Sequence, residues 1–195
     1  LKESAARGIV SQIILGLESC HAKRVLHRDI KLDNILLTND GCAKLCDFGV
    51  SLLMEEGRLA FDQSGTPAYI APELLRGHGY SGFKADVWNL GITLYTMLTG
   101  TIPFQSIDVA QLHELILEGK FNFPEKPELT PQVKDLIRRI LVLEPTDRLS
   151  LDEVKRHPWF LAGTFTSLET RPSLSDDSTT RKTIIQEIET YGFPR

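Results

Sequence analysis

The chain has 195 residues, of which 42% are hydrophobic and 25% are charged, and its formal net charge is −4. This length and composition are ordinary for one globular domain with a buried core. The acidic balance argues against a broad nucleic-acid-binding surface, and no apolar run approaches the roughly 18 to 20 residues of a membrane span, so we expect neither nucleic acid nor a membrane as a partner. Three cysteines, Cys20, Cys42 and Cys46, suit a reducing compartment, so we expect an intracellular protein of the cytoplasm, the nucleus or both.

The first predicted element is a helix from about residue 3 to residue 21. Ile9, Ile13 and Leu17 recur at helical spacing on one face, together with Val10 and Cys20. We interpret this stripe as a core face that carries no chemistry of its own.

The polar chemistry of the chain is concentrated in residues 27–49, which read HRDIKLDNILLTNDGCAKLCDFG. Asp29, Lys31, Asn34 and Asp47 supply two carboxylates, one ammonium and one amide, a set suited to handling a metal-bound polyphosphate. Mg²⁺ takes oxygen ligands, usually one or two carboxylates plus substrate phosphates. Lys31 can neutralise a transferring phosphoryl group, and Asp29 can accept a proton from an attacking hydroxyl.

A β-hairpin is predicted within this stretch. Two short apolar runs, 35–37 and 43–45, flank the turn sequence Thr-Asn-Asp-Gly at 38–41, whose glycine supplies a positive φ. Folding this hairpin brings Asn34 and Asp47 to the same open end, where the two side chains could share one ion.

The segments that follow alternate between polar and apolar character. Residues 50–70 are predicted to form a polar loop. Residues 83–98 are apolar around most of the circumference, which predicts a buried central helix, and Gly100 is placed to end it.

Three shorter helices and a tail complete the predicted elements. A helix is expected at residues 107–118, with Val109, Leu112, Leu115 and Ile116 facing inward. Two further helices begin at N-caps, one at Thr130 before Pro131 and one at the capping box Ser150–Glu153. Beyond residue 162, a Ser/Thr-rich linker is followed by TIIQEIETYGF at 183–193, a short amphipathic helix that cannot bury a core alone.

Four motifs, in this order, resemble those of protein kinases. They are H-R-D-x-x-x-x-N at 27–34, D-F-G at 47–49, A-P-E at 71–73 and D-x-W-x-x-G at 86–91. Lys31 and Thr66 resemble the serine/threonine branch of that family. The sequences at 99–104 and 157–160 are similar to those of the calmodulin-dependent and AMP-activated kinase group.

The resemblance implies a mainly α, protein-kinase-like fold: the helical C-terminal lobe with a small β-hairpin at the active site. We find neither the Gly-rich phosphate loop nor the strand lysine of the N-terminal β-rich lobe, so we expect that lobe to be absent from this chain. We therefore divide the chain into a partial kinase domain at 1–160, a flexible linker at 161–182 and a short helix at 183–195. This last helix weakly resembles the start of a ubiquitin-associated-like module.

The resemblance also implies roles for individual residues. Asp29 would be the catalytic base, with Lys31 and Thr66 completing the catalytic set and Lys31 contacting the γ-phosphate. Asn34 and Asp47 would be the Mg²⁺ ligands. The implied nucleotide-binding residues are Lys31, Asn34, Leu36, Cys46 and Asp47.

Other residues are implied to support this site. Glu73 would pair with Arg148 in the interior, and Asp86 would accept hydrogen bonds from the catalytic-loop backbone near His27 and Arg28. Asp62 stands where many relatives carry a phosphorylated threonine. It would either face Arg28 as a built-in negative charge or be a solvated loop residue.

These inferences predict that the parent protein transfers phosphate from ATP, with Mg²⁺, to serine or threonine of protein substrates. Its partners would be those substrates, ATP, the absent N-terminal lobe and regulatory proteins that bind the C-terminal tail. Two alternatives stay open. The chain could be a non-catalytic, pseudokinase-like scaffold, or its carboxylates could serve a metal-dependent hydrolase.

Overall fold

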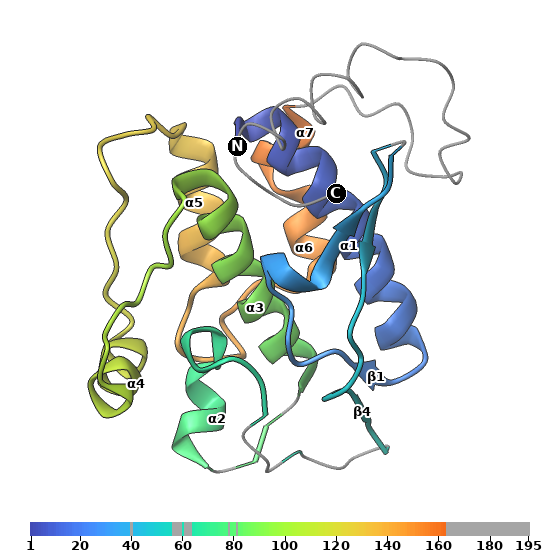
Figure 1. Ribbon diagram of the computed structural model, residues 1–195, viewed down its shortest axis with the longest axis vertical. Coiled ribbons are helices and arrows are strands. Elements are labelled where there is room, and N and C mark those ends of the chain that lie inside the picture. Colours follow the sequence, from blue (N-terminus) through green and yellow to red (C-terminus); the bar gives the residue numbers. More distant parts are fainter. Residues whose placement is uncertain (40, 56–59, 61–63, 78, 81, 163–195) are drawn as a thin grey trace.

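The computed structural model describes residues 1–39, 41–55, 60, 64–77, 79, 80 and 82–162. This part of the chain is mainly helical, as predicted (Figure 1). Its helices are α1 (Glu3–Ala22), α2 (Pro72–Arg76), α3 (Gly82–Thr99), α4 (Val109–Glu118), α5 (Pro131–Ile140), α6 (Leu151–Arg156) and α7 (Pro158–Leu161), with 3₁₀ turns at Leu32–Asn34 and Pro67–Tyr69. Its strands are β1 (Val25–Leu26), β2 (Ile35–Leu37), β3 (Ala43–Leu45) and β4 (Leu52–Leu53). None of the helices in these ranges has the length and apolarity that crossing a membrane requires.

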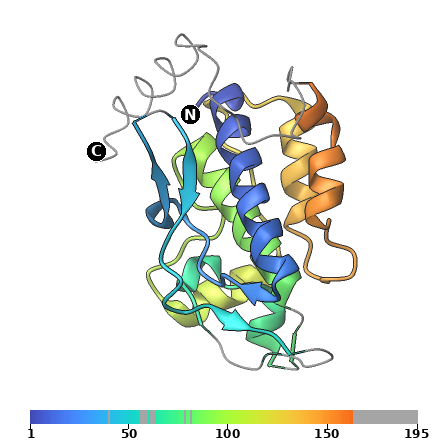
Figure 2. The same cartoon turned by 90° about the vertical axis from the view of Figure 1, so that its right-hand side faces the viewer.

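Helix α3 lies at the centre of the core and contacts both α1 and α5 (Figures 1 and 2). Its residues are buried on all sides, as the apolar stretch predicts, and Trp88 is completely inaccessible. Gly91 permits the close approach of α5, because a Cβ at this position would lie 2.4 Å from Cγ2 of Ile140. Gly100 follows the helix with a φ of 77°, which confirms its predicted position at the end.

Strands β2 and β3 form the predicted antiparallel hairpin, with Ile35 opposite Leu45. The turn is closed by a 2.9 Å hydrogen bond from the Thr38 amide to the Cys42 carbonyl. Gly41 has a φ of 80°, the conformation for which the turn sequence requires glycine. The hairpin packs on α1 through β3.

A second antiparallel pair lies within the segment that was predicted to be a loop. Strand β4 pairs with β1, and Val25 lies opposite Leu53. The loop prediction for residues 50–70 was therefore wrong at β4 and also at the 3₁₀ turn that begins at Pro67. Strand β4 could not be predicted because a strand of two residues shows no periodic pattern and its partner β1 is distant in the sequence.

The predicted helix caps are present. The Thr130 hydroxyl accepts a hydrogen bond from the Val133 amide, and Ser150 forms the reciprocal capping box with Glu153. Helix α4 begins later than expected, after the N-cap Asp108.

The inward face predicted for α4 is correct only in part. Leu112 and Ile116 are buried and Leu115 is partly buried, but Val109 is 54% exposed. The prediction was wrong for Val109 because the first turn of α4 extends past the surface against which Leu112 and Ile116 pack.

Glu73 and Arg148 form the predicted interior ion pair. The two guanidinium nitrogens donate to the two carboxylate oxygens at 2.7 and 2.8 Å, and only 1% of Arg148 is exposed. Arg148 also donates to the carbonyls of Val142 and Lys84, and its guanidinium lies 5.1 Å from the centre of the Trp88 ring. The pair fastens α2 to the loop that precedes α6.

Three predictions concern residues outside the described ranges. They are the charge at Asp62, the linker that was expected to extend to residue 182, and the amphipathic helix beyond it.

Candidate active site

The turn that carries Asp29 is anchored from the central helix by Asp86. The buried Asp86 carboxylate accepts hydrogen bonds from the backbone amides of His27 at 3.0 Å and Arg28 at 2.8 Å, as predicted. Arg28 has a φ of 68°, in a region that non-glycine residues seldom adopt. The Nε2 atom of His21 also contacts this carboxylate, at 2.8 Å. Asp86 thus stabilises the backbone conformation that presents Asp29.

Asp29 is the hub of the site. Its Oδ1 accepts hydrogen bonds from the Thr66 amide at 3.0 Å and the Thr66 hydroxyl at 2.7 Å. Its Oδ2 accepts one from the Asn34 amide group at 3.0 Å and lies 2.9 Å from the Lys31 ammonium. Lys31 also donates to the Thr66 hydroxyl at 2.7 Å, which closes a triangle of three side chains. The structure thus brings these four predicted residues together.

The charges of Asp29 and Lys31 are reinforced by this arrangement. Burial alone would raise the pKa of the Asp29 carboxyl, but the hydrogen bonds from Lys31 and Thr66 and the charge of Lys31 together hold its pKa below the usual value. The hydrogen bond to Asp29 in turn raises the pKa of the Lys31 ammonium. The site therefore holds a carboxylate and an ammonium in contact at neutral pH.

Gly65 sets the approach of Thr66 to Asp29. Its φ is 118°, and a Cβ there would lie only 2.7 Å from the carbonyl oxygen of Arg28. A side chain at position 65 would therefore separate the segment that carries Thr66 from the catalytic loop.

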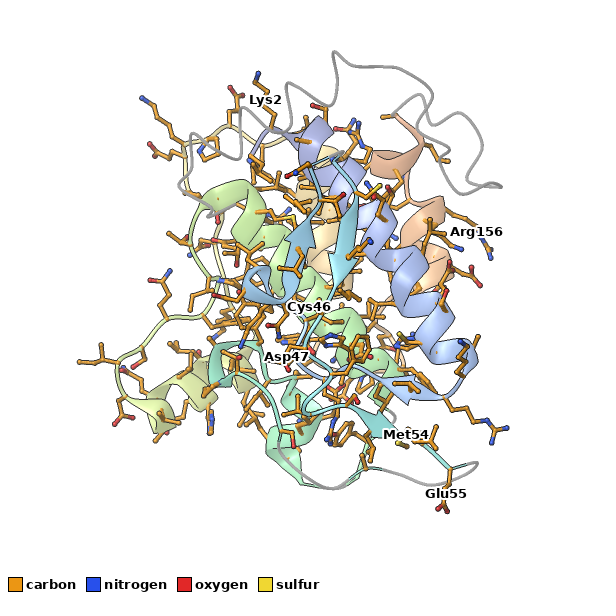
Figure 3. All side chains as sticks on the ribbon, turned by 45° about the vertical axis from the view of Figure 1, so that its right-hand side comes forward. Lys2, Cys46, Asp47, Met54, Glu55 and Arg156 are labelled. Atoms are coloured by element: carbon orange, nitrogen blue, oxygen red, sulfur yellow. The ribbon has the colours of Figure 1, made fainter. Side chains whose placement is uncertain are left out.

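The hairpin places Asp47 beside Asn34. The Cys46 amide donates to the Asn34 carbonyl at 3.0 Å, one residue before Asp47. Figure 3 shows Cys46 and Asp47 at the foot of the hairpin, near the middle of the molecule. Asp47 is exposed, has a φ of 60° and accepts a hydrogen bond from the Gly49 amide at 3.1 Å. This is the proximity that the predicted hairpin required.

Oxygen donors at this end of the hairpin fit a hard cation. The Asn34 amide nitrogen donates to both the backbone and the side chain of Asp29, which leaves its amide oxygen for another ligand. Asp47 adds an exposed carboxylate. In the described ranges, no group of three or more His, Cys, Asp or Glu side chains could hold a metal. An amide and one carboxylate suit Mg²⁺, which completes its shell with water and substrate phosphate.

His27 links the catalytic loop to the segment that carries Asp47. Its Nε2 contacts the Cys46 carbonyl at 3.0 Å, so this nitrogen carries the proton, and its ring meets Phe48 edge-on at 4.7 Å. The Cys46 side chain is partly buried beside Asp47. Leu36 lies on the exposed face of β2, two residues after Asn34, and is 55% exposed.

Two polar residues beside the site were not identified from the sequence. Asn89 donates to the Tyr69 carbonyl, and Thr93 contacts the Ile30 carbonyl; both side chains are buried in α3. Their spacing from Asp86, three and seven residues, places all three on one face of the helix. A polar stripe within an otherwise apolar helix was the signal that could have revealed them.

Comparison with known proteins agrees with this geometry. The family model described as the protein kinase domain matches residues 1–160. The chain is 41% identical over 162 residues to CBL-interacting serine/threonine-protein kinase 5 of Arabidopsis thaliana, covering 82% of this chain and 36% of that protein. It is 36% identical over 197 residues to SNF1-related protein kinase catalytic subunit alpha KIN12 of the same plant, covering 100% and 39%. Over 165 residues it is 40% identical to the probable serine/threonine-protein kinase MARK-B of Dictyostelium discoideum, covering 84% and 23%.

The chain thus spans less than half the length of these relatives. The matched region contains the whole hairpin and the four residues that meet at Asp29, which are Asp29, Lys31, Asn34 and Thr66. On this evidence the chain belongs to the protein kinase family.

Proposed function

We propose that this chain is the C-terminal lobe of a serine/threonine protein kinase that transfers the γ-phosphoryl group of ATP to protein hydroxyls. The observation that carries the proposal is the triangle of Asp29, Lys31 and Thr66, with contacts of 2.7 to 2.9 Å. Phosphoryl transfer depends mainly on positioning and charge neutralisation, and this triangle supplies a proton acceptor beside a fixed cation.

In this proposal the substrate hydroxyl replaces one donor on Asp29. The carboxylate accepts four hydrogen bonds in the structure, which fills about the four lone-pair positions that a carboxylate offers. Lys31 is the donor that leaves, because the γ-phosphate offers its ammonium a more highly charged partner. Thr66 and Asn34 keep Asp29 oriented while the substrate hydroxyl donates to the freed position.

Asn34 and Asp47 would hold Mg²⁺, which would neutralise charge on the phosphates of ATP. Leu36 and Cys46 would line the nucleotide pocket. The described residues contain no Gly-rich phosphate loop, so we assign the α- and β-phosphates to a second, β-rich lobe. Leu36 and Phe48, which flank the hairpin end, are 55% and 43% exposed, and these apolar side chains support packing of such a lobe against the hairpin.

The test is phosphate transfer from Mg-ATP to a serine- or threonine-containing protein by the full-length parent protein. Asp29→Asn should lower kcat by about 10²- to 10⁴-fold, the usual contribution of a positioned base. Asp152→Asn is the matched control: it makes the same chemical change at an exposed residue of α6 and should leave kcat unchanged. If Asp29→Asn retains the wild-type kcat, the assigned role is wrong. If the folded wild-type protein transfers no phosphate, the scaffold alternative replaces the proposal.

A further inference from the structure

Thr93 makes a contact with the catalytic loop that neither the motifs nor the proposed reaction explains. It lies within α3 and is completely buried. Its hydroxyl oxygen is 3.1 Å from the carbonyl oxygen of Ile30, the residue between Asp29 and Lys31. We propose that Thr93 is a positioning residue, whose hydroxyl holds this carbonyl and thereby fixes the two charged groups on either side. The inference rests on the proposed function.

The Ile30 carbonyl needs this donor. Ile30 is itself completely buried, so water does not reach its side of the loop. Among the described residues, the Thr93 hydroxyl is the only group that donates to this carbonyl. Buried backbone carbonyls are almost always paired, and an unpaired one destabilises the conformation that buries it.

A second acceptor competes for the same hydroxyl. Thr93 also lies 2.8 Å from the Asn89 carbonyl, one turn earlier in α3. This is a common contact for threonine in a helix, and Thr96 and Thr99 make it too. The Asn89 carbonyl, however, already accepts the helical hydrogen bond from the Thr93 amide. The hydroxyl therefore contributes most at Ile30, which has no other donor.

The position of Thr93 complements that of Asp86. The two residues are seven apart and lie on the same face of α3. Asp86 binds the backbone amides of His27 and Arg28, before Asp29, whereas Thr93 binds a carbonyl after it. One rigid helix thus holds the catalytic loop on both sides of Asp29. Among the described residues, Thr93 is the only α3 side chain that hydrogen-bonds the loop between Ile30 and Asn34, and removing its hydroxyl removes that hydrogen bond.

The test uses the full-length protein with three single variants. Thr93→Val keeps the shape of the side chain and removes the donor, whereas Thr93→Ser keeps the hydroxyl. Thr99→Val is the matched control. The Thr99 hydroxyl makes the same kind of bond within the helix, donating to the Tyr95 carbonyl at 2.9 Å, but it does not contact the catalytic loop. We expect Thr93→Val to lower kcat by about 10- to 100-fold with little change in the KM for ATP, since small displacements of catalytic groups have effects of this size. Thr93→Ser and Thr99→Val should stay within about 3-fold of the wild type.

Amide hydrogen exchange provides a second readout that does not depend on activity. Thr93→Val should accelerate exchange in the loop 28–35 by about 10-fold and leave the amides of α5 unchanged, because the opening is local. Equal acceleration in α5 would show general destabilisation and would overturn the proposal. An unchanged kcat in Thr93→Val would also overturn it, as would a loss in Thr93→Ser as large as in Thr93→Val. An inactive wild type would refute the proposed function, while the exchange result would still decide whether Thr93 holds the loop.

Discussion

Removing one partner of the Glu73–Arg148 pair should destabilise the protein by an amount that depends on which partner is removed. Breaking a buried pair costs about 3–5 kcal/mol, because the remaining charge is left without compensation. In Glu73→Gln, the Arg148 guanidinium still donates to the carbonyls of Val142 and Lys84. In Arg148→Met, the Glu73 carboxylate and the carbonyls of Val142 and Lys84 lose the hydrogen bonds that Arg148 donates.

We therefore expect a decrease in the free energy of unfolding of about 3 kcal/mol for Glu73→Gln and about 5 kcal/mol for Arg148→Met. The double variant Glu73→Leu/Arg148→Met leaves no buried charge, so it should be more stable than Arg148→Met alone. Arg76→Met is the control. It removes a pair with Glu144 that is 32% and 57% exposed, so it should cost only about 0–1 kcal/mol.

The assay is urea unfolding followed by far-ultraviolet circular dichroism and by tryptophan fluorescence. Trp88 is a direct probe, because the Arg148 guanidinium lies over its ring. Equal costs for the two single variants would refute the argument that the carbonyl contacts matter. A cost for Arg148→Met as small as that of Arg76→Met would refute the interior pairing itself.

Three further predictions concern glycine positions and pH. Gly91→Ala should lower the free energy of unfolding by about 1–3 kcal/mol, because its Cβ would meet Ile140. Gly8→Ala, whose Cβ would have nothing within 4 Å, should raise the free energy of unfolding by about 0.5–1 kcal/mol through helix propensity. Thermal unfolding compares the two variants, and equal shifts in their unfolding temperatures would contradict the packing argument. Gly65→Ala should lower kcat with little loss of secondary structure, because the Cβ would push Thr66 away from Asp29; unchanged kinetics would show that the loop accommodates a side chain. The pKa of Asp29 is lowered in the folded protein, so its contribution to stability is complete above the ordinary aspartate pKa of about 3.9 and is lost as the pH falls through the lower folded-state value. Acid unfolding of Asp29→Asn should lack this component, and identical pH dependence in both proteins would contradict the assigned shift.

Much of the site can be predicted because its parts are local. The catalytic-loop pattern places Asp29, Lys31 and Asn34 within six residues of one another. The hairpin then follows from two short apolar runs and a turn that needs glycine at position 41. The caps at Thr130 and Ser150 are equally local, since each bonds an amide three residues later. Such contacts depend on short-range geometry that a sequence pattern specifies.

Only the tertiary structure established which distant groups complete these local elements. The pairing of β1 with β4, the contact of Asn89 with Tyr69 and that of Thr93 with Ile30 join segments between 20 and 63 residues apart. The exposure of Val109 likewise depends on where the surrounding core ends. Residue type and periodicity determine which faces are apolar and which side chains can bond. The packing of α3 against the loops decides which of the many possible partners each buried polar group finds, because only that packing removes water from it.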